Sequence, residues 1–239
     1  MTTKRSSRAR FIFAAGWAVA SGVGATVGLV VVIIGQAGCG LTAGAALYWT
    51  GLFSPPKVEP EHVLDDRVLL ILVDDPEERV DWPQTRAYLA ESVRGQLLAN
   101  EVVTRVLPAD TTDRLQAAHA DFPTRGCRQI GRLAGADQVL WLEVRDFYAR
   151  QEITEVDVAA RLAVTVKVIN SRDGDDAAAV RIWPVHPQGR RISADLTVGQ
   201  VSRAKGIDAI ARLLAEDVAD KVAKLFYEHR ADEFERRPK

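Results

Sequence analysis

The chain has 239 residues, of which 47% are hydrophobic and 26% are charged, so it can bury a core and is not expected to be disordered. Its 31 basic and 32 acidic residues leave a formal net charge of −1, which argues against a general nucleic-acid binder. Two cysteines are too few for a disulfide framework or a zinc cluster. The length allows one good-sized domain together with a membrane anchor.

The N-terminus combines a basic start with a long apolar stretch. Lys4, Arg5, Arg8 and Arg10 are followed by residues 11–34, which carry no charge. An uncharged segment of this length can cross hydrocarbon as a helix, and its basic flank is expected to stay in the cytoplasm. We therefore expect a signal peptide or membrane anchor over residues 1–38, with the remainder of the chain on the extracytoplasmic side of the cell envelope.

A cysteine stands at the end of this stretch. Ala37, Gly38 and Cys39 resemble a lipobox, the motif at which bacterial lipoproteins are diacylated on cysteine and then cleaved before it. The resemblance implies that Cys39 is the lipidation site. Gln36 departs from the motif and the apolar stretch is long for a signal peptide. An uncleaved single-span helix, with small residues every fourth position from 16 to 28, is therefore the alternative.

The following residues divide into a linker, a domain and a tail. Residues 39–66 are expected to form a juxtamembrane segment and linker, because aromatic residues suited to the membrane interface precede the helix-breaking Pro55 and Pro56. The strand and helix patterns begin after them and predict one soluble domain over residues 67–228. The charged residues 229–239 are expected to form a frayed tail.

The first half of the domain alternates between strand and helix patterns. Continuous apolar runs predict buried strands, whereas apolar residues every three to four positions predict helices. In chain order these patterns predict a strand at 68–73, a helix carrying Leu89, a strand at 102–107, short helices from Asp110 and Thr124, and a strand at 138–144.

The second half begins with strict alternation over residues 156–168. This pattern predicts a strand that is antiparallel to its neighbour, with Val164 on a buried face and Thr165 and Lys167 on a wet one. The remaining patterns predict strands at 180–183 and 192–198 and a long amphipathic helix at 207–225. The order predicts an α/β (α+β) fold, with a mixed sheet, an antiparallel C-terminal meander and helices packed on the sheet.

The passage from helix into strand at residues 133–140, Leu-Ala-Gly-Ala-Asp-Gln-Val-Leu, resembles a group of bacterial envelope domains. The group includes the amino-terminal domain of TolB, the curli-export lipoprotein and the lipoprotein activators of penicillin-binding proteins. The likeness covers about residues 66–228. The layout of anchor, linker and domain also looks like uncharacterised lipoproteins of planctomycete-type bacteria. The resemblance implies an envelope accessory or assembly domain and carries over no catalytic residues.

Three carboxylates are the candidates for ligand binding or chemistry. Asp74 and Asp75 follow the first strand, where α/β proteins often bind ligands, and Asp146 follows the third strand. Turn formation before Pro76 is the simpler explanation of the adjacent pair. Cys127 lies on an apolar helix face and is expected to be a small buried residue rather than a nucleophile.

The other side chains with chemical potential indicate no site. The four histidines have no metal-ligand spacing and are expected at the surface, and the two strand tryptophans are expected to pack in the core or on the sheet. These residues are His62, His119, His186, His229, Trp141 and Trp183. We expect no catalytic residue, no metal and no cofactor.

The sequence thus favours a membrane-tethered envelope lipoprotein that acts as a non-catalytic interaction or assembly module. Its expected partners are the membrane and other envelope proteins, not nucleic acid. The alternative is a small-ligand-binding or enzymatic domain that uses the strand-end carboxylates near Asp74, Asp75 and Asp146. A cavity holding carboxylates with shifted pKa values favours this alternative, whereas an exposed sheet edge favours an interaction module.

Overall fold

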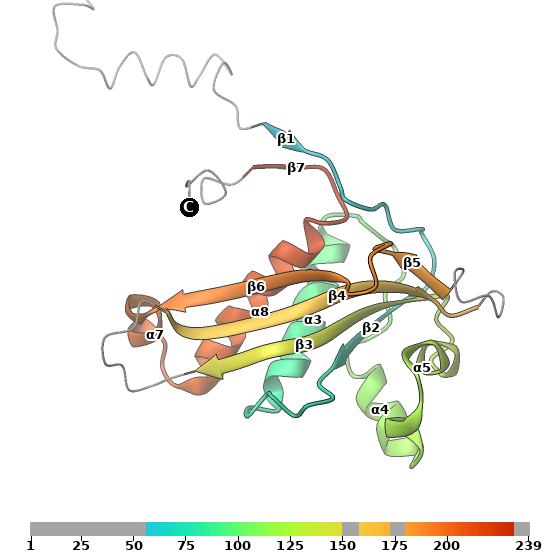
Figure 1. Ribbon diagram of the computed structural model, residues 1–239, viewed down its shortest axis with the longest axis horizontal. Coiled ribbons are helices and arrows are strands. Elements are labelled where there is room, and N and C mark those ends of the chain that lie inside the picture. Colours follow the sequence, from blue (N-terminus) through green and yellow to red (C-terminus); the bar gives the residue numbers. More distant parts are fainter. Residues whose placement is uncertain (1–55, 150–157, 173–179, 232–239) are drawn as a thin grey trace, which may run out of the picture. The chain divides into compact units, whose positions relative to one another are not determined.

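The computed structural model describes residues 56–149, 158–172 and 180–231, so the expected anchor and its Cys39 lie outside the described residues. The described part is a mixed sheet with helices packed on it, which confirms the predicted fold class (Figure 1). None of the described helices is long and apolar enough to cross a membrane.

Strands and helices alternate at first, and strands then follow one another. In chain order they are β1 (Lys57–Val58), β2 (Leu69–Asp74), α3 (Gln84–Ala99), α4 (Thr111–Ala118), the 3-10 helix η1 (Phe122–Thr124), α5 (Cys127–Leu133), β3 (Gln138–Ala149), β4 (Val158–Asn170), β5 (Arg181–Trp183), β6 (Arg190–Thr197), α7 (Val198–Arg203), α8 (Ile207–Ala223) and β7 (His229–Arg230).

In the described part of the chain, the main sheet has five strands, and β2 and β3 are its one parallel pair. β4 is antiparallel to β3 on one edge, and β5 and β6 are both antiparallel to β4 on its other edge. The predicted antiparallel partner of the alternating strand is therefore confirmed. β1 and β7 form a separate two-stranded ribbon that joins the start of the domain to its end.

One face of the sheet carries the main core. α3 and α8 lie behind the sheet in Figure 1 and cover this face. α8 presents a row of alanines, Ala211, Ala215 and Ala219, which are all fully buried and leave room for the side chains of α3 and the strands. The hydroxyl of Tyr88 on α3 donates a hydrogen bond to Asp208 on α8 at 2.5 Å, so a polar contact ties the two helices together at the edge of the core.

Among the described residues, helices cover only one half of the opposite face. η1 and α5 pack there on Leu70, Leu72 and Val139 and form a smaller apolar cluster. α5 comes unusually close to the sheet at Gly131. A Cβ atom at this position would lie 2.5 Å from Val139 Cγ2 and 2.8 Å from Ser171 Cβ, so the close approach requires glycine.

The predicted wet face of β4 is wrong, because Thr165 and Lys167 are buried on it (4% and 9% exposed). The turn before β6 lies over them. A Cβ atom on Gly189 would come within 2.4 Å of Thr165 and 3.0 Å of Lys167, and its φ of +79° also favours glycine. The alternation of polar and apolar residues is correct, but it cannot show that a turn from elsewhere in the chain covers the polar side.

Lys167 and its neighbours form an ion-pair network on this face. Its ammonium group lies 3.3 Å from the carboxylate of Glu143 and 4.4 Å from the ring centroid of Trp141. Arg145 pairs with the same carboxylate at 2.7 Å and donates a hydrogen bond to Thr165 Oγ1 at 3.0 Å. A buried charge is tolerated only when it is paired and hydrogen-bonded, and this network meets that condition.

Three local predictions need correction. Residues 102–107 do not form a strand, since only Val106 makes a bridge, to Leu69. The predicted helix start at Thr124 is replaced by η1 and a start at Cys127, and α7 was not predicted. The capping box of Thr197 and Gln200 is the sequence signal that could have revealed α7.

The segment expected to be a linker contacts the domain closely. Leu64 is buried in the main core, and the backbone N–H groups of Glu61 and His62 donate to the carbonyl oxygen of Leu225. The His62 ring stacks on Trp183, with 6.0 Å between the ring centroids. Residues 56–64 are therefore held against the end of α8 before β2 begins.

Candidate functional site

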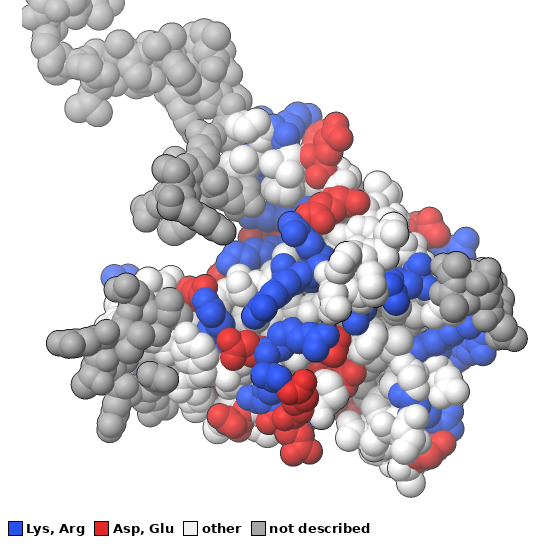
Figure 2. All heavy atoms as spheres, in the orientation of Figure 1, with Lys and Arg blue, Asp and Glu red and all other residues white. Residues whose placement is uncertain are grey.

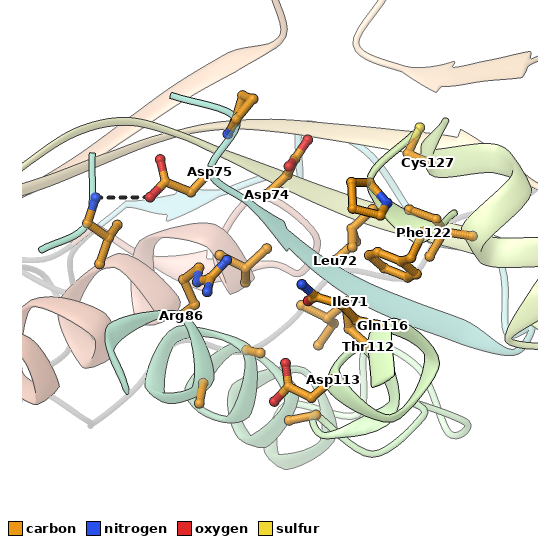
Figure 3. A pocket seen from close by; sticks show the side chains of 18 of the residues that line it. Ile71, Leu72, Asp74, Asp75, Arg86, Thr112, Asp113, Gln116, Phe122 and Cys127 are labelled. Atoms are coloured by element: carbon orange, nitrogen blue, oxygen red, sulfur yellow. Dashed lines mark hydrogen bonds between the residues drawn. The ribbon is translucent and has the colours of Figure 1, made fainter. Parts of the chain in front are cut away.

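The largest concentration of candidate residues lies around the end of β2. A cavity of about 770 Å³ there is lined by residues of β2, α3, α4, η1 and α5 (Figure 3). Asp74 and Asp75 from the end of β2 both line it, together with Cys127 at the start of α5. Asp146, the third predicted carboxylate, does not line it. The structure thus brings together two of the three acidic residues predicted from sequence.

Asp75 holds the turn that follows β2. Its two carboxylate oxygens each accept a backbone N–H at 2.9 Å, from Arg79 and Val80. The turn also contains Glu78, whose positive φ of 50° needs such support. Asp75 therefore has the turn-forming role that its position before Pro76 predicted, and its oxygens are already engaged.

Asp74 is the carboxylate of this pair that is left for other roles. It is half-buried and accepts one hydrogen bond from the indole Nε1 of Trp141 at 3.2 Å. Burial, assisted by the nearby Glu143 and Asp75, raises the pKa of Asp74, although the Trp141 hydrogen bond opposes the shift. The carboxylate therefore lacks full solvation in the folded protein and favours a proton or a cationic partner.

Cys127 does not have the environment of a reactive thiol. It packs beside the smaller apolar cluster, and burial raises the pKa of its thiol. The negative charge of the nearby Asp74 also raises this pKa, which disfavours the thiolate that a nucleophile requires. The raised thiol pKa agrees with the prediction that Cys127 is not activated as a nucleophile, but the residue is half-buried and lines the cavity, so the predicted burial is only partial.

The positions of the histidines and tryptophans agree with the sequence predictions in part. His186 is exposed, as predicted, but His62 is half-buried in the aromatic cluster with Trp183, and its burial lowers its pKa. Trp183 joins the core and Trp141 packs on the second face of the sheet, as predicted. Over residues 56–149, 158–172 and 180–231, no three His, Cys, Asp or Glu side chains gather as a metal site.

The second candidate site is the outer edge of β6. No strand from the described part of the chain pairs with this edge. A groove of about 1190 Å³ runs beside it, lined by β6, α8 and the β1–β7 ribbon. The ammonium group of Lys221 on α8 donates to the carbonyl oxygen of Ser193 at 3.0 Å, so this carbonyl points away from β4 and into the groove.

Charged side chains surround this edge on the second face of the sheet. Figure 2 shows Lys and Arg side chains gathered over the strands, with Asp and Glu among them. Arg161 and Asp195 form a pair across β4 and β6, with nitrogen–oxygen distances of 2.5 and 3.1 Å. Arg191 on β6 is exposed and makes no ion pair within the described residues. The edge therefore offers both backbone groups and a free cation.

The open edge of β6 could not be recognised from sequence. The alternation in residues 192–198 predicts a strand but carries no information on which of its edges has a partner. A strand edge is defined by pairing between distant segments, and only the tertiary structure contains that pairing.

Comparison with known proteins gives no family. No family model and no curated protein matches the sequence. Among solved structures, the PelC dodecamer from Paraburkholderia phytofirmans is 18% identical, covers 73% of this chain and 97% of its own, and gives a TM-score of 0.36. The hypothetical protein CT253 from Chlamydia trachomatis is 14% identical, with 66% and 94% covered and a TM-score of 0.39.

A third similar structure is the lipoprotein GNA1162 from Neisseria meningitidis. It is 15% identical, covers 65% of this chain and 96% of its own, and gives a TM-score of 0.36. At such identities and TM-scores these similarities concern the general course of the chain and assign no function to it.

Proposed function

We propose that the chain is a membrane-tethered protein of the cell envelope that acts as a non-catalytic interaction or assembly module. The observation that carries this proposal is the open edge of β6 beside its groove. An unpaired strand edge is a ready template for an extended segment of another protein, which gains main-chain hydrogen bonds by adding to the sheet.

The N-terminal sequence supports the tether. The basic start, the apolar stretch and the lipobox-like Ala37-Gly38-Cys39 motif favour a lipid on Cys39, and the likeness of residues 133–140 to envelope accessory domains agrees with this location. A tether keeps the domain near other envelope proteins and raises its effective concentration for them, so modest contacts suffice.

The β6 edge is tested by replacing Ser193 with proline. The N–H and C=O of one strand residue point to the same side, so the N–H of Ser193 faces the groove and is not needed for pairing with β4. Proline is tolerated on an edge strand in that position, but it removes the donor that an added strand needs. We expect Ser193→Pro to fold and to lose crosslinks to envelope proteins in intact cells by at least about tenfold.

Ser193→Ala is the matched control, because it keeps the backbone donor while removing the hydroxyl. It should retain the crosslinks. Unchanged crosslinking of a folded Ser193→Pro variant would exclude the β6 edge as the contact surface.

The tether is tested by intact-mass measurement of protein extracted from membranes. The expected mass is that of residues 39–239 with a diacylated Cys39 at the N-terminus. A mass that corresponds to the full-length, unlipidated chain would contradict the lipid anchor and favour the uncleaved single-span helix.

A small-ligand-binding or enzymatic role for the β2 cavity is the second candidate function. The raised pKa of Asp74 favours it. Asp74→Asn, with Asp75 left intact to hold the turn, separates the two functions. If this variant folds and keeps its crosslinks but loses the cellular phenotype, ligand binding or chemistry at Asp74 becomes the better proposal.

A further inference from the structure

The cavity at the end of β2 lies along an open strand edge. β2 pairs with β3 on one side only. On its other side, the N–H of Leu69 donates to the carbonyl of Arg105, and the N–H of Leu107 donates to the carbonyl of Leu69, both at 2.9 Å. Alternate residues of a strand direct their backbone groups to opposite sides, so Ile71 and Val73 point the same way as Leu69. Both of these residues line the cavity.

The outward backbone groups of Ile71 and Val73 have no hydrogen-bond partner among the described residues. No hydrogen bond to their N–H or C=O occurs within the described ranges, although Ile71 is only 3% exposed. Backbone polar groups at buried positions are almost always hydrogen-bonded, so an extended segment lying along this edge would supply partners for these groups. Among the described residues, no strand therefore occupies the position next to β2 beyond Leu69.

Apolar surfaces lie on both sides of this position. Leu72, Phe122 and Ile130 line the cavity on the side of α5, and they are 4%, 9% and 5% exposed. Ala87 and Ala90 of α3 line it on the other side. Side chains of an extended segment alternate between the two faces of a sheet, so both sets of its side chains would meet apolar atoms.

Acidic side chains outnumber basic ones in the lining of the cavity. Asp74, Glu78 and Asp113 line it together with Asp75, and Figure 3 shows Asp113 on α4 across the cavity from β2. Arg86 and Arg125 are its basic residues, and Arg125 is already paired with Asp121 at 2.7 Å. The charge left for an incoming segment is therefore negative.

We infer that this cavity is a docking slot for an extended segment of a partner protein that pairs with β2, is apolar in its middle and carries lysine or arginine at the end near Asp74. The stretch from Leu70 to Asp74 accommodates about five residues at about 3.3 Å each. The inference rests on the proposed interaction role but concerns a different edge of the sheet from β6.

Amide hydrogen exchange of the full-length protein in lipid nanodiscs tests the slot at residue resolution. Without peptide, the amides of Ile71 and Val73 should exchange faster than those of Leu70 and Leu72, which pair with β3. The probes are the capped peptides KKVAVTA and ATVAVKK, which place the basic end at either terminus. One of them should slow exchange at Ile71 and Val73 at least tenfold and leave Leu70 and Leu72 unchanged.

Three controls sharpen the test. The peptides EEVAVTA and ATVAVEE should bind at least tenfold more weakly than their lysine counterparts. Ala87→Trp fills the slot from α3 and should abolish the protection, whereas Ala99→Trp, at the exposed far end of the same helix, should not.

Several results would overturn the inference. Equal protection of all four amides without peptide would mean that the chain itself occupies the edge. If neither lysine peptide protects Ile71 and Val73 at 1 mM, no segment docks there. Unchanged binding to Ala87→Trp would place the peptide elsewhere. Each of these results leaves the Ser193→Pro crosslinking test of the β6 edge standing, so failure of the slot and failure of the proposed function are distinguishable.

Discussion

The two faces of the central sheet are both buried, but by different means. On the face covered by α3 and α8, large aliphatic side chains meet alanines, and burial of apolar surface accounts for the contact. On the opposite face, α5 covers one half, while a turn and the network of Glu143, Arg145 and Lys167 cover the other. A polar side of a strand can thus become interior when charges are paired and a distant turn lies over them.

The largest expected effect is on the free energy of unfolding, and it comes from substitutions at two adjacent residues of β4 that face opposite sides of the sheet. Val164→Asp places an unpaired charge in the main core, where the residue is fully buried, and should reduce the free energy of unfolding by at least about 4 kcal/mol. Thr165→Asp also places a carboxylate in a buried position, but Arg145 and Lys167 flank it there. We therefore expect the free energy of unfolding to fall by about 1–2 kcal/mol. Denaturant unfolding measures both. Equal losses would show that the network does not stabilise a carboxylate on this face.

The next largest effect on stability comes from glycine-to-alanine substitutions in two helices, one on each face of the sheet. Gly131→Ala pushes α5 away from Val139 and Ser171 and should cost about 1–3 kcal/mol. Gly95→Ala on α3 meets no atom within 4 Å and should stabilise the protein by about 0.5–1 kcal/mol, because alanine favours a helix more than glycine does. Thermal unfolding distinguishes the two signs, and stabilisation by Gly131→Ala would contradict the close approach of α5.

The smallest expected effect on stability depends on pH and comes from Asp74, the carboxylate near the network of Glu143, Arg145 and Lys167. Burial raises the pKa of Asp74, so the folded protein disfavours its ionised form, and stability is lost as pH rises above the unfolded pKa of about 3.9. Asp74→Asn should therefore stabilise the protein at pH 7 by less than about 1 kcal/mol, since the group is only half-buried, and this gain should disappear near pH 4.

Asp75→Asn serves as the neighbouring control for this measurement. It weakens an acceptor of two backbone N–H groups and should destabilise the turn at pH 7. If both variants change stability in the same direction, the different roles assigned to the two adjacent carboxylates are wrong.

The sequence by itself determined the elements whose residues interact locally. β2, α3, β3 and α8 were predicted because an apolar run or a helical stripe reflects burial along the element itself. The mixed sheet followed from their order, and the turn role of Asp75 followed from its position before Pro76. The environment of Cys127 was also predictable, since an apolar helix face indicates what surrounds it.

The tertiary structure alone decided everything that depends on contact between distant segments. The burial of Lys167 depends on the turn at Gly189, and the separation of Asp146 from Asp74 depends on where β2 ends beside β3. The open edges of β2 and β6 depend on which strands they lack as neighbours. Residue periodicity records whether a side chain is apolar, but hydrogen-bond pairing between strands uses backbone groups that every sequence shares, so the edges became visible only in the folded chain.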